Sequence, residues 1–176
     1  MIYYQRGTIS LPLILYANSA SILKWWVDGS HVVHPTLHGH SGSCLSLGQG
    51  MPISGSMKQK LNTCSSTEIE LVVADDFMPM ILWTNYFLAA QGYGAKDTIL
   101  YQDNQSAILL EKNGCKSSSR CTKHLNVCYY FITDHIDAQE LYVHYCSTDQ
   151  MIADFFTKPL QGKLFLTFHK TIMNHP

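Results

Sequence analysis

The chain has 176 residues, of which 46% are hydrophobic and 14% charged, and its formal net charge is −1. This composition is typical of a folded globular protein and excludes an intrinsically disordered chain. The balanced charge excludes a basic field over the whole surface, so contacts with nucleic acid would have to come from local patches. Six cysteines lack the density of a disulfide scaffold, and we expect reduced thiols in an intracellular protein, cytoplasmic or nuclear and not secreted.

The first 20 residues show no clear periodicity, and the apolar run at residues 11–17 is too short to span a bilayer. We therefore expect no membrane partner. The next segment, "ILKWWVD", predicts a strand over residues 22–28 that ends at Asp28. The small-residue runs "SGSCLSLGQG" and "MPISGSM" then predict an antiparallel hairpin over residues 41–57.

A long apolar helix is predicted next, within residues 64–94. It starts from a Ser-Ser-Thr cap with acids in the first turn, and it stops at Gly92 and Gly94. Pro79 lies inside this helix. Because proline removes a helical N–H and clashes with the preceding turn, we expect a kink there or a split into two helices.

The second half of the chain alternates strands and helices. "DTILYQD" predicts a strand that ends at Asp103, and "NQSAILLEKNG" predicts a short helix behind it. "SSSRCTKHLNVCYYFITDHID" predicts a basic loop leading into an amphipathic helix, and "QELYVHYC" predicts another strand. "STDQMIADFFTKPL" predicts a capped helix that ends before Pro159, and the tail from Gln161 predicts a final helix.

This order of elements predicts an α/β fold, a mixed sheet with helices packed on both faces. Right-handed crossovers would place the strands that start at Ile22 and Thr98 side by side and parallel. Asp28 and Asp103 would then be neighbours at the strand ends, where open sheets bind their ligands.

Two more acids could reach the same end of the sheet: Glu70 in the first turn of the long helix, and Asp154 in the short helix near the C-terminus. Four converging carboxylates would repel one another, so such a cluster persists mainly when divalent cations neutralise it. Hard oxygen ligands select Mg²⁺ or Mn²⁺. Two such ions about 4 Å apart can activate water and stabilise the leaving oxygen in phosphodiester cleavage.

The chain resembles the ribonuclease H domain of copia-type LTR-retrotransposon polyproteins through "WWVDGS", "KQKLNTCSSTEIELVVADD", "ILYQDNQSAILLEKNG", "RCTKHLNVCYYFI" and "MIADFFTKPLQGKLF". The resemblance implies a ribonuclease H-like mixed five-stranded sheet and metal-dependent hydrolysis of the RNA strand of RNA–DNA hybrids. It also implies two Mg²⁺ ions, with Mn²⁺ as an alternative, and two partners: an RNA–DNA hybrid and a reverse transcriptase domain of the same polyprotein family.

The resemblance also implies a division of the chain. Residues 1–20 would be the remnant of a preceding reverse-transcriptase connection segment, residues 21–160 the ribonuclease H-like domain, and residues 161–176 a C-terminal helix or tail. Gly29 stands where close relatives more often have Ala.

Carried over position by position, the catalytic and metal-binding acids are Asp28, Glu70, Asp103 and Asp154. Glu68 is an alternative to Glu70, but positions two apart on a helix face different directions. The pair Glu70-Leu71 matches the family, whereas Glu68 falls at a capping-box position three residues after Ser65. The candidates for nucleic-acid binding follow the strand ends or lie in the basic loop: Ser30, Asn104, Gln105, Ser106, Arg120, Lys123 and His124.

Several other side chains receive a plainer interpretation. The histidine-rich run at residues 31–40 predicts a structural or hybrid-contacting loop, in which His34 and His40 match histidines of the family. Cys115, Cys121, His124 and Cys128 lack zinc-knuckle spacing, so no zinc is expected. His144 falls inside a strand, and no catalytic histidine is assigned. Large aromatic residues are expected in the core: Trp25, Trp26, Trp83, Tyr86 and Phe87.

One alternative function stays open beside the nuclease. The chain could be a catalytically silent, retrotransposon-derived fragment that at most binds nucleic acid or a partner, and its lack of net basic charge motivates this hypothesis. A related nuclease or integrase on the same fold is a third hypothesis, because fold does not fix function. The order of the motifs favours the ribonuclease.

Overall fold

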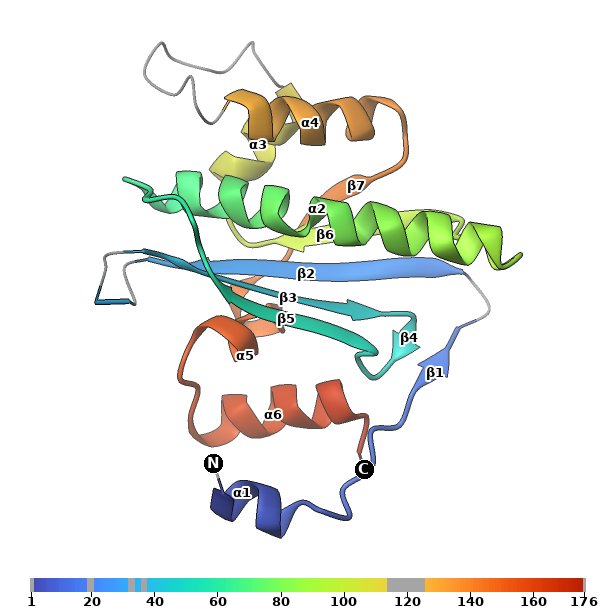
Figure 1. Cartoon of the computed structure of the whole chain (residues 1–176), viewed down its shortest axis with the longest axis vertical. Coiled ribbons are helices and arrows are strands. Elements are labelled where there is room, and N and C mark those ends of the chain that lie inside the picture. The colour runs from blue at the N-terminus through green and yellow to red at the C-terminus, as the bar shows by residue number, and fades with distance from the viewer. Residues whose placement is uncertain (1, 19–20, 32–33, 36–37, 114–125, 176) are drawn as a thin grey trace.

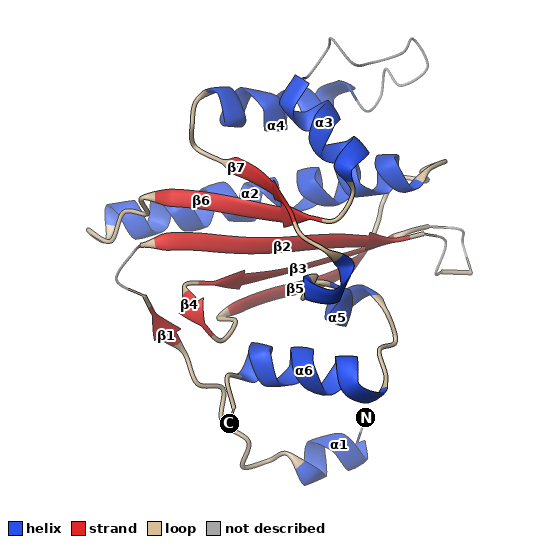
Figure 2. Ribbon diagram, turned by 180° about the vertical axis from the view of Figure 1, so that it is seen from behind, coloured by secondary structure: helices blue, strands red, loops and turns tan. Residues whose placement is uncertain are grey.

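A five-stranded mixed sheet with strand order β5-β3-β2-β6-β7 forms the centre of the molecule (Figures 1 and 2). The computed structural model describes residues 2–18, 21–31, 34–35, 38–113 and 126–175. The strands of the sheet are β2 (Ile22–Ser30), β3 (His40–Ser46), β5 (Ile53–Lys58), β6 (Asp97–Gln102) and β7 (Tyr142–Tyr145). β2 pairs antiparallel with β3 and parallel with β6, and β3 pairs antiparallel with β5. The predicted fold class, parallel pair and hairpin are confirmed.

Helices cover both faces of this sheet, with α2, α3 and α4 on one side and α5 and α6 on the other (Figure 1). The helices are α1 (Ile2–Gly7), α2 (Ser66–Ala90), α3 (Gln105–Asn113), α4 (Asn126–Asp137), α5 (Asp154–Thr157) and α6 (Gly162–Met173). Two short strands, β1 (Tyr16–Ala17) and β4 (Gly48–Gln49), form a separate antiparallel pair. None of the described helices combines the length and apolar character needed to cross a bilayer.

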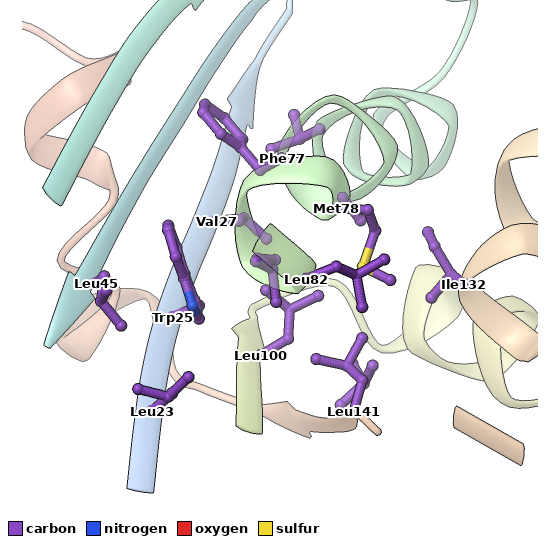
Figure 3. Close-up of a cluster of buried hydrophobic side chains, with 14 of the residues drawn as sticks. Leu23, Trp25, Val27, Leu45, Phe77, Met78, Leu82, Leu100, Ile132 and Leu141 are labelled. Carbon is purple, nitrogen blue, oxygen red and sulfur yellow. The ribbon is translucent and has the colours of Figure 1, made fainter. Parts of the chain in front are cut away.

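The main core lies between the sheet and α2 (Figure 3). Alternate residues of β2, namely Leu23, Trp25 and Val27, are buried there because side chains of a strand point to opposite faces in turn. Full burial of each such side chain stabilises the fold by about 1.5–3 kcal/mol. The opposite face of β2 carries Lys24, Trp26 and Asp28, so the alternation that builds the core also sends Asp28 to the other side.

α2 begins at the predicted cap, where the Ser65 side chain accepts a hydrogen bond from the Glu68 backbone N–H. Of the two outcomes expected at Pro79, the split into two helices is wrong, because α2 continues without interruption from Ser66 to Ala90. The kink stays a prediction. Pro79 lies on the exposed side of the helix, while Phe77, Met78 and Ile81 are buried on either side of it. Packing of these neighbours outweighs the loss of one backbone hydrogen bond.

The predicted helix over residues 147–158 is also wrong as a single element. The chain instead forms a 3₁₀ turn at Thr148–Gln150, leaves helical geometry at Met151 with φ −76° and ψ 86°, and resumes as the four-residue α5. Met151 and Ala153 are buried beside Cys146 in a small apolar cluster. Burial of these side chains compensates for the interruption of the helix. As a result, Asp154 becomes the first residue of α5.

The expectation that the aromatic residues lie in the core holds for Trp25, holds in part for the half-buried Trp26, and fails for three residues of α2. Trp83, Tyr86 and Phe87 are 58%, 53% and 46% exposed. These positions are spaced by three and four residues, so they share the face of α2 that points away from the buried Ile81. Trp83 and Phe87 stack on each other with ring centroids 5.0 Å apart.

α6 packs against the sheet and is not a free tail. It buries Phe168 and Ile172 in a cluster with Cys44 and Met51. The helical spacing of the apolar residues after Gln161 therefore predicted the element correctly.

Candidate active site

Asp28 and Asp103 lie at neighbouring ends of the parallel strands β2 and β6. The register pairs Trp26 with Tyr101, and each aspartate follows two residues later along its strand direction. Asp28 is 1% exposed and Asp103 is half-buried. The hydroxyl of Thr148 donates to Asp103 Oδ2 at 3.1 Å. The structure thus brings together the two acids that strand pairing predicted to be neighbours.

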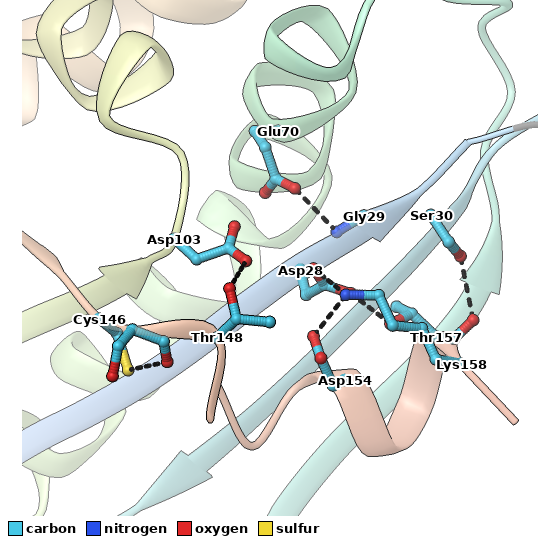
Figure 4. A network of polar contacts seen from close by, with 11 residues as sticks. Asp28, Gly29, Ser30, Glu70, Asp103, Cys146, Thr148, Asp154, Thr157 and Lys158 are labelled. Atoms are coloured by element: carbon cyan, nitrogen blue, oxygen red, sulfur yellow. Dashed lines mark hydrogen bonds and ion pairs between the residues drawn. The ribbon is translucent and has the colours of Figure 1, made fainter. Parts of the chain in front are cut away.

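Glu70 reaches this pair from the second turn of α2, one turn later than predicted, because α2 begins at Ser66 (Figure 4). Asp28, Glu70 and Asp103 each offer a carboxylate oxygen, and these three oxygens lie within 4.8 Å of one another. The Gly29 backbone N–H donates to Glu70 Oε1 at 3.3 Å. Burial raises the pKa of Glu70 well above its usual value, and the charges of Asp28 and Asp103 raise it further.

Asp154 joins the group through Lys158, which lies four residues later. The Lys158 ammonium is 2.8 Å from Asp154 Oδ1 and 3.3 Å from Asp28 Oδ1. The Thr157 hydroxyl donates to the other oxygen of Asp28. Burial, and next the charge of Asp28, raise the pKa of Asp154 to about 6. All four predicted acids therefore converge at one end of the sheet.

Sequence reasoning missed Thr157 and Lys158. A signal was present, because a lysine four residues after an aspartate is an ion-pair spacing on a helix. The signal was not recognised because α5 is a single turn, too short to show helical periodicity in the sequence.

Asp28, Glu70 and Asp103 fit a divalent cation, because their carboxylate oxygens lie within 4.8 Å of one another. Glu70 Oε2 is buried and accepts no hydrogen bond from the described residues, so one anionic oxygen of the cluster is left for a ligand. Mg²⁺ and Mn²⁺ prefer carboxylate oxygens of this kind. Burial is the main cause of the raised pKa of Glu70 and Asp154, and a bound cation would offset it together with the repulsion between the carboxylates.

Glu68 lies apart from the cluster, at the start of α2. Its backbone N–H donates to Ser65 Oγ at 3.2 Å, and its Oε2 accepts the Cys64 backbone N–H at 2.7 Å. This is a capping arrangement, with the return bond made to Cys64. The structure thus places Glu70 with the acids and Glu68 on the helix cap.

The residues predicted to contact nucleic acid have different surroundings. Ser30 is buried and donates to the Thr157 carbonyl at 3.0 Å. Asn104 caps α3 by accepting the backbone N–H groups of Ser106 and Ala107. Gln105 and Ser106 are exposed beside Asp103. Three more candidates lie outside the described residues: Arg120, Lys123 and His124.

The other predicted side chains have structural contacts or lie outside the described part. His34 Nε2 is 3.0 Å from His40 Nδ1, and His40 Nε2 is 2.8 Å from Ser56 Oγ. His144 lies in β7, and its ring is perpendicular to that of Tyr101, with the ring centroids 6.2 Å apart. Cys115 and Cys121 lie outside the described residues, as does the side chain of Cys128. The described cysteines are free thiols: Cys44, Cys64 and Cys146.

Gly29 lies between the acidic site and the core, next to Asp28 in β2 and facing Ile69 and Val73 of α2. We expect Gly29→Ala to destabilise the fold. A Cβ there would overlap Cγ2 of Ile69 and lie 2.8 Å from Cγ2 of Val73, both of which are buried. Overpacking of this kind costs about 1–3 kcal/mol. Urea unfolding measures the loss, with Gly94→Ala as the control because a Cβ there meets its nearest atom at 3.9 Å. Equal stability of the two variants would show that Ile69 and Val73 move aside freely.

No protein-family model matches the chain. A retrovirus-related Pol polyprotein from transposon TNT 1-94 of Nicotiana tabacum is 32% identical over 163 residues, which is 92% of this chain and 12% of the relative. The polyprotein from transposon RE1 of Arabidopsis thaliana is 32% identical over 123 residues, which is 69% of this chain and 8% of the relative. Among solved structures, LC11-RNase H1 in complex with an RNA/DNA hybrid has a TM-score of 0.54 at 9% identity, covering 76% of this chain and 92% of that one.

The strand order, the helices on both faces and this structural likeness define a ribonuclease H-like fold, as predicted. The chain is a homologue of the retrovirus-related Pol polyproteins of plant transposons, and it spans 12% or less of the length of these relatives. The resemblance to the ribonuclease H domain of retrotransposon polyproteins is confirmed.

Proposed function

We propose that this chain is a metal-dependent endoribonuclease that hydrolyses the RNA strand of RNA–DNA hybrids, as part of a retrotransposon polyprotein. The observation that carries the proposal is the convergence of Asp28, Glu70 and Asp103 within 4.8 Å at the ends of two parallel strands. The likeness to a ribonuclease H solved with an RNA/DNA hybrid supports this substrate class.

In this proposal the acids divide between two cations, Mg²⁺ or alternatively Mn²⁺. Asp28, Glu70 and Asp103 would hold one, and Asp28 with Asp154 would hold the other. When bound, the ions supply an activated water and stabilise the leaving oxygen of the phosphodiester. The chain itself orients the carboxylates through donors on the backbone and on two threonines: Gly29, Thr148 and Thr157. Hydrogen bonds of this kind fix the orientation of carboxylates that bind a metal ion.

Substrate contacts are assigned to the rim of the cluster. Gln105 and Ser106 are exposed polar residues on the first turn of α3, directly after Asp103 and Asn104. Ser30 would act indirectly, because its hydroxyl donates to the carbonyl of Thr157, the residue whose own hydroxyl donates to Asp28. The sequence adds Arg120, Lys123 and His124 as phosphate-binding candidates. Selectivity for a hybrid would come from its shape and from 2′-hydroxyl contacts.

The division of the chain and its polyprotein partner belong to the same proposal. Residues 21–160 form the nuclease, with residues 1–20 as the remnant of a reverse-transcriptase connection and residues 161–176 as a C-terminal helix packed on the sheet. A reverse transcriptase domain is the expected partner because the relatives are Pol polyproteins.

Cleavage by the purified chain tests the proposal. The substrates are one labelled RNA strand paired with DNA, the same strand paired with RNA, and the strand alone, each with Mg²⁺ and with EDTA. We expect cleavage of the hybrid with Mg²⁺ and none in the other reactions. Uptake of Mg²⁺ without cleavage would instead support the silent fragment, and cleavage that persists in EDTA would overturn the metal mechanism.

A further inference from the structure

Lys158 places a positive charge inside the acidic cluster (Figure 4). Its ammonium lies between Asp154 Oδ1, at 2.8 Å, and Asp28 Oδ1, at 3.3 Å. The two carboxylate side chains are 3% and 2% exposed, whereas the lysine side chain is 36% exposed. The lysine therefore enters the site from the solvent side, and two buried carboxylates share its single positive charge.

The position of this ammonium divides the cluster in two. Asp28, Glu70 and Asp103 face one another with Glu70 Oε2 lacking a partner among the described residues. Asp28 and Asp154 instead share the ammonium. A cation coordinated by both Asp28 and Asp154 would need the space that the ammonium occupies, and two cations at that separation repel strongly in a buried site.

The lysine has a route out of the site. Lys158 ends α5 in an extended conformation, with φ −125° and ψ 144°, and Pro159 follows it. Its four-carbon stem has several rotatable bonds, and the side chain already reaches solvent. Rotation of the stem alone would free both aspartates without moving the backbone of α5.

We propose that Lys158 is a built-in competitor of the second cation, which binds between Asp28 and Asp154 only when the ammonium swings out to solvent. This inference rests on the proposed two-cation function and adds the order in which the two cation sites fill. The site of Asp28, Glu70 and Asp103 fills first, and the second site fills at a higher cation concentration because the ion pairs with Lys158 must break.

Calorimetric titration with Mg²⁺ tests the competition on the whole chain. Lys158→Met is expected to lower the dissociation constant of the second ion by about 10-fold or more, since competition by a close charge pair is worth at least about one decade. The first ion should change less. Lys158→Arg should retain a weak second site because it keeps the positive charge. Lys163→Met, an exposed lysine of α6, is the control for loss of one charge.

A second measurement uses the unaltered chain and so does not depend on the folding of any variant. Acetic anhydride modifies free amines, and mass spectrometry reports the rate at each lysine. We expect Lys158 to react slowly without Mg²⁺ and at least about 10-fold faster at saturating Mg²⁺, because an amine released from two carboxylates is accessible. Lys163 should react at one rate under both conditions.

The outcomes separate this inference from the proposed function. If the chain binds two ions and cleaves the hybrid, but Lys158→Met shifts both affinities equally or neither, the competition is overturned and the nuclease stands. A Lys158 that reacts no faster with Mg²⁺ has the same consequence. If the unaltered chain binds no Mg²⁺, the metal-dependent function fails and the competition fails with it.

Discussion

Glu70→Gln is expected to lower the rate of hybrid cleavage by about 1000-fold or more, because losing about 4 kcal/mol of transition-state stabilisation at a metal site has that effect. The substitution keeps the shape of the side chain and removes the anionic oxygen that accepts no hydrogen bond from the described residues. Asp103→Asn removes charge from the same cluster and should cause a loss of similar size. Single-turnover cleavage with saturating Mg²⁺ measures both.

Glu68→Gln is the matched control for this prediction. It makes the same chemical change two residues away on the same helix, and its amide oxygen can still accept the Cys64 N–H that Glu68 accepts at 2.7 Å. The cleavage rate should stay within about two-fold of the original, as for a surface substitution outside the site. If Glu68→Gln abolished cleavage and Glu70→Gln did not, the roles of the two residues would be reversed.

Thermal unfolding separates a lost cation ligand from a lost fold. Burial raises the pKa of Glu70, so its ionised form disfavours the folded state and stability falls as pH rises through the raised pKa. Glu70→Gln removes that penalty. The variant should therefore be at least as stable as the original chain near neutral pH while being inactive.

The convergence of Asp28 and Asp103 could be predicted from the sequence because two strong rules act together. Strand alternation sends Asp28 to the face opposite Trp25, and right-handed crossovers make β2 and β6 parallel neighbours. The choice between Glu70 and Glu68 combined two arguments: the resemblance implied the pair Glu70-Leu71, and the capping-box spacing from Ser65 assigned Glu68 to the start of α2. Strand alternation and helix capping are local features, whereas the crossover rule is a general rule of topology that needs only the order of the elements.

The contacts around Asp154 could not be predicted in the same way. α5 is a single turn, so it has no periodicity to reveal which side chains point inward. The exposure of the aromatic residues of α2 could not be predicted for a different reason. Trp83 and Phe87 look like core residues by type, but α2 is apolar on more than one side and the sheet covers one side only. Which side is covered is a property of the whole fold.

Glu111 on α3 is a buried acid that the proposed mechanism does not use. It is 0% exposed, and neither carboxylate oxygen accepts a hydrogen bond from the described residues. Burial is the largest influence on this carboxyl and raises its pKa from 4.5 to about 8. Such a group is neutral in the folded chain at pH 7 and ionised in the unfolded chain.

Glu111→Gln is therefore expected to stabilise the protein increasingly as pH rises. In the original chain the pKa of Glu111 is higher in the folded state than in the unfolded state. Its free energy of unfolding is therefore undiminished below about pH 4.5 and falls as the pH rises towards 8. The full loss is on the order of 5 kcal/mol, since one pKa unit corresponds to about 1.4 kcal/mol. Glutamine has nearly the same volume, does not ionise, and avoids this loss.

Urea unfolding at pH 5 and pH 8.5 measures the effect, with Asp137→Asn on the exposed surface of α4 as the control. The stability gap between Glu111→Gln and the original chain should be small at pH 5 and reach several kcal/mol at pH 8.5, a large part of the total for a domain of this size. The control should show no such widening. A gap that stays constant with pH would mean that Glu111 is ionised in the folded protein, with a cationic partner to hold it. Because an unpaired buried charge is far costlier than a buried neutral carboxyl, that result would require a rearranged α3.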